Sequence, residues 1–210
     1  MEAEQLLEGS IDTHCHGSSE TAFDDVEALR LAGMARMKGI VFKSHMWPTM
    51  DYVRRLKSEV DGIEAWSSIT LNISSGGFNP WATEAAIEQG AKVIWFPTWS
   101  AGNDLRKNAF SRFMKDRLPT LNRLGPDAGL SVFNDLGDLD RNVKEILALA
   151  RDHDVAVFTG HISPEESLAV AREAKNMGFE KLLITHPYGR SVGASAEHLM
   201  VKQRETPCCG

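Results

Sequence analysis

Five of the seven histidines of this 210-residue chain fall at or just after the ends of short apolar segments. These five are His14, His16, His45, His161 and His186. Imidazole is the commonest metal ligand near neutral pH, because its free nitrogen lone pair needs no deprotonation. Alternate residues of a strand point to the same side, so His14 and His16 can reach one ion. The sequence therefore predicts a divalent-metal site with these five ligands, and we expect His153 and His198, which lie in polar stretches, to be solvated.

Two charged residues precede these histidines on the same segments. Asp12 stands two residues before His14, so we expect its carboxylate on the same strand face, orienting an imidazole or acting as general base. Lys43 stands two residues before His45, and a buried ammonium needs a partner. We interpret both as catalytic residues, with Lys43 binding a substrate anion or, if carboxylated, bridging metals. The alternative for Lys43 is a side chain that points outwards into water.

Polar residues after two further apolar segments are candidates for substrate binding, namely Asn72, Asn79 and Thr98. Glycines at 76 and 77 permit unusual backbone angles in the loop 71–80, and Asn79 followed by proline opens a helix. An ordinary turn is therefore an equally good interpretation of this loop. Cys15 lies between two candidate ligands and should point to the opposite side of the strand, as a small buried residue.

Short apolar segments alternate with longer amphipathic ones, which predicts an α/β fold with a parallel sheet. The seven expected strands are 9–14, 39–44, 64–72, 92–98, 130–134, 155–160 and 181–186. Several of them are continuously apolar, as is typical of strands covered on both faces. Amphipathic helices are expected over 24–38, 80–89, 140–152 and 164–177, and the locally basic stretch 101–126 is expected to be a helical excursion.

The first strand leads into Asp12-Thr13-His14 and not into a glycine-rich turn, which disfavours a doubly wound nucleotide-binding sheet. The pattern favours a TIM-like (β/α) barrel. A complete eight-stranded barrel needs about 250 residues, so we expect a seven-stranded barrel that is incomplete or truncated. The whole chain, 1–210, is expected to be a single barrel domain.

The net charge, the apolar runs and the cysteines exclude further classes of function. A net charge of −6 argues against nucleic-acid binding, because no broad basic surface is supplied. Neither a membrane-spanning apolar run nor a secretory leader is evident, so we expect no membrane partner. Three cysteines make no disulfide framework, which favours a reducing cytoplasm. The expected partner is a small-molecule substrate.

The string Ile11-Asp12-Thr13-His14-Cys15-His16, with His161 and His186 at later strand ends, resembles the amidohydrolase superfamily of metal-dependent hydrolases. Over roughly residues 9 to 190 the chain more closely resembles an uncharacterised bacterial and archaeal branch of that superfamily. The motifs that carry this likeness are Phe42-Lys43-Ser44-His45, Leu71-Asn72, 76–80, Trp95-Phe96-Pro97-Thr98, Gly160-His161 and Thr185-His186-Pro187. The resemblance implies a (β/α) barrel that activates water on one or two metal ions to hydrolyse an amide, ester or lactone. Zinc is the first choice, with manganese, iron or nickel as alternatives.

One departure from the amidohydrolase pattern leaves two alternatives open. Amidohydrolases carry an aspartate after the last strand, as metal ligand and proton acceptor, and no strand with such an aspartate follows His186. The polymerase and histidinol phosphatase family, a seven-stranded barrel that hydrolyses phosphate esters, is the first alternative, although its acidic ligand has only Asp135 and Glu84 as weak candidates here. A truncated, metal-binding chain without catalysis is the second. Its open sheet edges would suit a partner subunit, so a homo-oligomer is left open.

Overall fold

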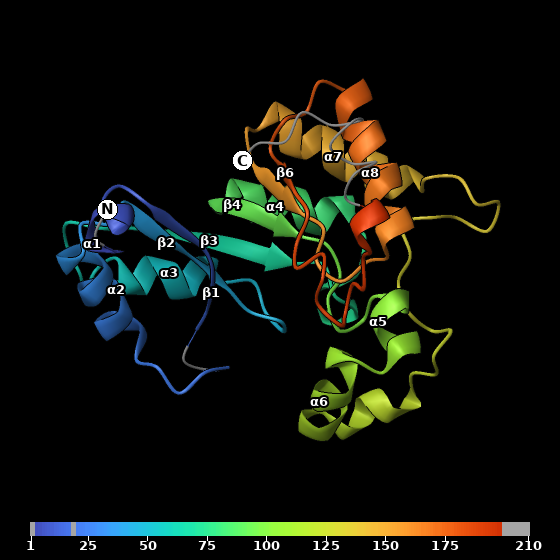
Figure 1. The fold of residues 1–210 in the computed structure, drawn as a ribbon, viewed down its shortest axis with the longest axis horizontal. Helices are drawn as coiled ribbons and strands as arrows, with labels where there is room; N and C mark the ends of the chain where they lie inside the picture. Colours follow the sequence, from blue (N-terminus) through green and yellow to red (C-terminus); the bar gives the residue numbers. More distant parts are fainter. Residues whose placement is uncertain (1–2, 18–19, 199–210) are drawn as a thin grey trace.

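Six parallel strands form one sheet in chain order in the computed structural model, which describes residues 3–17 and 20–198 (Figure 1). The strands are β1 (Ile11–His16), β2 (Gly39–Lys43), β3 (Glu64–Thr70), β4 (Ala91–Trp95), β5 (Ala156–Phe158) and β6 (Leu182–Leu183). Each strand pairs in parallel with the next one along the chain. The expected α/β fold with a parallel sheet is therefore confirmed, and among the described residues β1 and β6 are its edges.

Helices occupy the connections between the strands. They are α1 (Ala3–Leu7), α2 (Asp25–Met34), α3 (Met50–Leu56), α4 (Pro80–Glu88), α5 (Gly102–Lys107), α6 (Phe110–Arg117), α7 (Arg141–Asp152) and α8 (Pro164–Asn176), with 3-10 turns at Ile73–Ser75 and Pro119–Arg123. α8, which matches the helix expected over 164–177, begins with a reciprocal capping box between Ser163 and Glu166. Figure 1 shows α5 and α6, the expected excursion, set apart from the helices that flank the sheet. No helix in the described part of the chain is both long and apolar enough to cross a bilayer.

The sheet curls strongly, so that strands far apart in its order face each other. The rings of His14 on β1 and Trp95 on β4 have centroids 4.5 Å apart. In a flat sheet three strand spacings would separate them by about 14 Å. The ring of His186, just after β6, lies 4.7 Å from that of His14, where a flat sheet would require about 24 Å. Six strands in sequential order, curled in this way, make an incomplete barrel.

The curl divides the apolar core into an inner and an outer part. Inside, Val41, Val93, Trp95 and Phe158 pack together from three strands. Outside, one cluster joins β1, β2 and β3 to α2 and α3, and a larger one joins β3, β4 and β5 to α4, α7 and α8. Both faces of the central strands are therefore covered, which explains their continuously apolar sequences.

The expected strand over 130–134 is wrong, and with it the count of seven. Leu130 makes a single isolated bridge to Ala101, while β5 occupies the place beside β4. The backbone N–H of Val132 donates to the carboxylate of Glu166 instead of to a neighbouring strand. The side chain of Asn134 then accepts from two backbone N–H groups of a tight turn. Side-chain acceptors thus satisfy the backbone here, a competition that alternating apolar residues do not reveal.

Gly160, which precedes His161, provides a test of how closely the ends of β4 and β5 approach. Its φ is +60°, and a Cβ there would lie 2.4 Å from Phe96 O and 2.6 Å from Pro97 O. We expect Gly160→Ala to lower the free energy of unfolding by about 2–4 kcal/mol, measured by urea denaturation, because both strain and overlap oppose the native backbone.

Gly178→Ala is the matched control. Gly178 also has a positive φ, +69°, but a Cβ there would meet no atom within 4 Å. It carries the conformational strain without the overlap, so it should cost clearly less than Gly160→Ala. Equal losses in the two variants would show that β4 and β5 do not need this close contact.

Candidate metal centre

The structure brings the five predicted ligands together into a closed loop of imidazole rings, called here the histidine cluster. Successive ring centroids are 5.0 Å apart for His14 and His16, 4.5 Å for His16 and His45, 6.4 Å for His45 and His161, 6.2 Å for His161 and His186, and 4.7 Å for His186 and His14. The rings come from β1 and from the segments after β2, β5 and β6. Parallel strands that curl into a partial barrel bring their carboxyl ends to one rim, so residues far apart in sequence meet there.

Burial keeps much of this cluster uncharged. It lowers the pKa of His14 to about 2, with the nearby charge of Lys43 as the second cause. Burial also holds the pKa of His45 well below its usual value, and lowers those of His161 and His186. A neutral imidazole keeps one nitrogen lone pair, which is the form that can bind a cation.

His14 is the most crowded member of the cluster. Its Nε2 lies 3.1 Å from His16 Nε2 and 3.2 Å from Lys43 Nζ. Lys43 is 1% exposed, and its ammonium lies 4.0 Å from the ring centre of Trp95. Lys43 therefore points into the barrel, which excludes the interpretation that it snorkels outwards. Burial lowers its pKa to about 7, against the opposing charge of Glu20.

Glu20 is the acidic residue that the sequence analysis missed. Its Oε2 accepts from His16 Nδ1 at 2.7 Å, and its Oε1 accepts from the Ser44 hydroxyl at 2.7 Å and from the backbone N–H of His45 at 2.6 Å. Burial raises the pKa of Glu20, but these hydrogen bonds outweigh it and the net pKa is lowered. Ligand atoms of His16, Glu20 and His45 all lie within 4.8 Å of one another, a spacing that could hold a metal ion.

Neither weak acidic candidate belongs to this group. Asp135 is exposed in the turn after Asn134, and Glu84 lies on α4. The available signal was the position of Glu20 in the loop directly after β1, four residues beyond His16.

Two predicted substrate-binding residues support His45 from behind. Thr98 Oγ1 lies 2.9 Å from His45 Nδ1, and Asn72 donates to both Thr98 Oγ1 and the backbone carbonyl of His45. Asn72 and Thr98 are fully buried, and these hydrogen bonds fix the ring of His45. Asn79 is placed elsewhere, as the N-cap of α4 that accepts from the N–H groups of Trp81 and Ala82.

Asp12 does not take the predicted position beside an imidazole ring. It is exposed and accepts a hydrogen bond from the backbone N–H of His14, at 2.9 Å. The register of β1 against β2 is irregular between Asp12 and Cys15, so simple alternation fails there. Cys15 does point away from the cluster, as predicted, and packs on the core beside α2, where burial raises its pKa to about 11.

A second missed residue, Asp104 on α5, contacts the other side of the cluster. Its Oδ2 lies 2.9 Å from His161 Nδ1, and its side chain is fully buried. Phe110, at the start of α6, packs its ring 4.4 Å from that of His45 and 5.8 Å from that of His161. The excursion between β4 and β5 therefore supplies one wall of the site.

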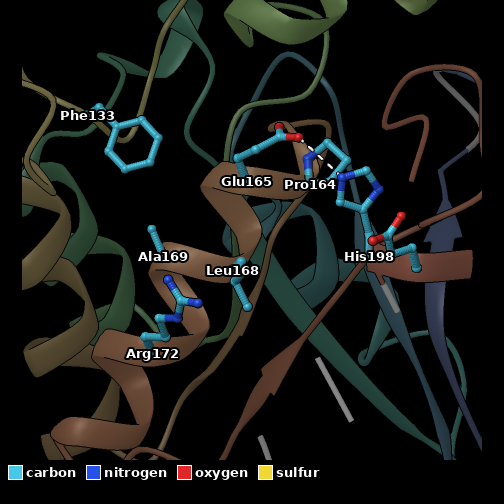
Figure 2. A pocket seen from close by; sticks show the side chains of 8 residues that line it. Phe133, Pro164, Glu165, Leu168, Ala169, Arg172 and His198 are labelled. Atoms are coloured by element: carbon cyan, nitrogen blue, oxygen red, sulfur yellow. Dashed lines mark ion pairs between the residues drawn. The ribbon is translucent and has the colours of Figure 1, made fainter. Parts of the chain in front are cut away.

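The two histidines expected to be solvated lie outside the cluster. His153 is exposed, whereas His198 is half-buried and lies 3.3 Å from Glu165 (Figure 2). The pocket drawn there, of about 630 Å³, is lined by Phe133, Pro164, Glu165, Leu168, Ala169, Arg172, Glu197 and His198. None of its lining residues belongs to the histidine cluster. Cys208 and Cys209 lie outside the described residues.

Sequence comparison places the chain in a family. The profile of DUF6282, described as a family of unknown function, matches residues 9–204. The chain belongs to the DUF6282 family. That membership carries no activity of its own, and it does not link this DUF6282 member to the amidohydrolases. No curated protein is significantly similar to it.

Solved structures give only weak likenesses to this DUF6282 member. A provisional deoxyribose-phosphate aldolase from Coccidioides immitis aligns with a TM-score of 0.46 and 10% identity, over 90% of this chain and 63% of its own length. The tetrameric deoxyribose phosphate aldolase of Aeropyrum pernix aligns with a TM-score of 0.37 and 14% identity, over 97% of this chain and 92% of the aldolase. A mandelate racemase/muconate lactonizing enzyme from a marine actinobacterium gives 0.31 and 13%, over 89% and 58%. These scores are too low to carry a fold or a chemistry over to this chain.

The buried imidazoles predict how the stability of the metal-free protein depends on pH. Below about pH 6.5, His14 and His45 bind protons in the unfolded chain but stay unprotonated in the folded protein, where burial lowers their pKa values. The contribution of these two rings to stability is therefore complete above that pH and falls as the pH drops towards about 5, with a slope of about 1.4 kcal/mol per pH unit for each ring. Urea denaturation across this interval measures the slope.

Removing one ring should flatten the curve. We expect His14→Gln to reduce the slope of the free energy of unfolding against pH by about 1.4 kcal/mol per pH unit, the contribution of one proton. The variant removes a group whose folded-state pKa is about 2. His153→Gln, at an exposed position, should leave the slope unchanged. A wild-type slope retained in His14→Gln would mean that His14 is not held neutral.

Proposed function

We propose that this chain is a metal-dependent hydrolase of the amidohydrolase type, acting as one domain over residues 1–210. The observation that carries the proposal is the 3.1 Å distance between His14 Nε2 and His16 Nε2. His16 Nδ1 lies 2.7 Å from Glu20, so a ring hydrogen on that atom alone leaves the Nε2 lone pair of His16 free, and the same tautomer of His14 leaves its Nε2 lone pair free. Both Nε2 lone pairs could then bind one cation, which would replace the Lys43 ammonium as the partner of His14 Nε2.

The distance between these nitrogens suits one ion. Two nitrogens at about 2.0–2.1 Å from zinc lie roughly 2.9–3.4 Å apart for bond angles of about 90–109°. His14 and His16 would hold the ion, with His45, His161 and His186 as further ligands and the Glu20 carboxylate beside His16 and His45. Zinc is our first choice, with manganese, iron or nickel as alternatives, and one or two ions fit the proposal.

A bound divalent cation supplies Lewis acidity that activates water and polarises the carbonyl or phosphoryl group of a substrate. The chain's own groups orient the site around it. Glu20 fixes the ring of His16 through Nδ1, and Thr98 does the same for His45. Among the described residues no carboxylate lies within ion-pair distance of Lys43, so we assign Lys43 to an anionic group of the substrate. Asp12 has no part in this scheme, because its carboxylate is bound to the backbone.

A phosphoesterase of the polymerase and histidinol phosphatase type is the second candidate. Two observations favour it. Glu20 supplies an acidic group beside His16 and His45, and Lys43 supplies a cation next to His14. Phosphate esters need both metal ligands and a cation for their oxygens.

The metal site is tested by elemental analysis of the purified protein. We expect at least about one equivalent of a divalent metal in the wild type and its loss in the His14→Ala, His16→Ala double variant. The loss follows because the two facing Nε2 atoms are removed together.

His153→Ala, an exposed histidine outside the cluster, is the control for the change in histidine content. Circular dichroism of both proteins establishes that they are folded. A stoichiometric ion that persists in the folded double variant would place the metal somewhere else.

The reaction class is tested with the metal-loaded protein on a panel of amides, esters, lactones and phosphate monoesters. We expect turnover of a member of the first three classes, reduced by at least about 100-fold in the folded double variant. Turnover confined to phosphate esters would favour the second candidate. Full metal occupancy without turnover on the panel would instead support a metal-binding chain without catalysis.

A further inference from the structure

We propose that Asp104 is a positioning residue that keeps the ring hydrogen of His161 on Nδ1, so that the Nε2 lone pair is free for the histidine cluster. Asp104 is fully buried, and its Oδ2 lies 2.9 Å from His161 Nδ1. Both oxygens of this carboxylate accept backbone N–H groups, so the carboxylate is the acceptor and Nδ1 is the donor.

Two backbone amides leave the carboxylate no freedom to turn. Ser111 N donates to Asp104 Oδ1 at 2.6 Å, and Phe110 N donates to Oδ2 at 3.3 Å. Both belong to the first turn of α6, directly after the α5 that carries Asp104. Because a backbone N–H is always a donor, both carboxylate oxygens of Asp104 act as acceptors.

The same helix also fixes the backbone around the ring. Asn103 Nδ2 donates to the carbonyl of His161 at 3.0 Å and to that of Ser191 at 2.7 Å. Lys107 donates to the carbonyl of Val192. α5 thus joins the segment after β5 to the segment after β6, which is the last strand of the sheet among the described residues. Asp104 orients a ring whose main chain is already held.

This inference deepens the proposed function, on which its consequence for metal binding rests. With Nδ1 committed to Asp104, Nε2 is the only ring nitrogen of His161 that can serve the cluster. Loss of a carboxylate that orients a ligating histidine typically costs about 10–100-fold in metal affinity. The tautomer itself is a property of the metal-free chain and does not depend on catalysis.

Asp104→Asn is the decisive variant, because it keeps the shape of the side chain. Ser111 N–H makes the shorter contact, 2.6 Å against 3.3 Å for Phe110 N–H, so we expect the amide oxygen to face Ser111 and the amide NH₂ to face His161, with loss of the Phe110 hydrogen bond. Nδ1 then becomes the acceptor and the hydrogen moves to Nε2. Asparagine in place of a histidine-orienting aspartate inverts the tautomer in the same way in serine proteases.

The readout is the pair of ¹⁵N chemical shifts of the His161 ring in metal-free protein near pH 8. We expect the Nδ1–H pattern in the wild type and the Nε2–H pattern in Asp104→Asn. In the metal-loaded protein we expect the variant to bind zinc about 10–100-fold more weakly. Glu166→Gln is the matched control, since it also turns a buried carboxylate that accepts backbone N–H groups into an amide.

Glu166→Gln should leave both readouts at wild-type values. An Nε2–H or doubly protonated ring in the wild type would overturn the proposal, even if Asp104→Asn failed to fold. An inverted tautomer with unchanged zinc affinity would remove His161 from the metal ligands and leave the role of Asp104 intact. Absence of zinc from the wild type would contradict the proposed function without touching the tautomer.

Discussion

The contact between Lys43 and His14 at the mouth of the curled sheet is the interaction on which the site depends. The two nitrogens are 3.2 Å apart. If both groups were charged, they would repel each other by about 5 kcal/mol at an effective dielectric constant of about 20. The contact therefore exists only while His14 is an uncharged acceptor, and burial enforces that state. An uncharged His14 keeps a ring lone pair, which the proposed cation site requires.

Side chains from the loops fix the orientation of the imidazole rings that the strands bring together. Each of three rings has a separate partner at its Nδ1 atom: Glu20 for His16, Thr98 for His45 and Asp104 for His161. These partners lie on the loop after β1, the segment after β4 and α5, so the strands bring the rings together and the loops set their rotation. Such partners hold the imidazole rings in place before a metal ion or substrate binds, which lowers the entropic cost of binding.

The sequence was informative wherever one rule of geometry sufficed. The apolar segments located six strands, and their carboxyl ends located five rings that meet. It failed where side chains compete with the backbone, as Glu166 and Asn134 do around 130–134. It also missed Glu20 and Asp104, because both lie in segments without strand periodicity, and their partners are set by the path of the chain in three dimensions. Asp12 was misplaced by an irregularity of register that alternation does not express.

The long connection between β4 and β5 accounts for how an open sheet keeps a closed site. Residues 96–155 separate these neighbouring strands, whereas residues 44–63 suffice between β2 and β3. A connection of that length is longer than is needed to join two adjacent strands, so we expect it to have a further role. Its α5 bonds to the segments that follow β5 and β6, and its Phe110 covers two of the rings. In a complete barrel further strands would hold these segments. Here α5 does so, which ties the geometry of the histidine cluster to a helix outside the sheet.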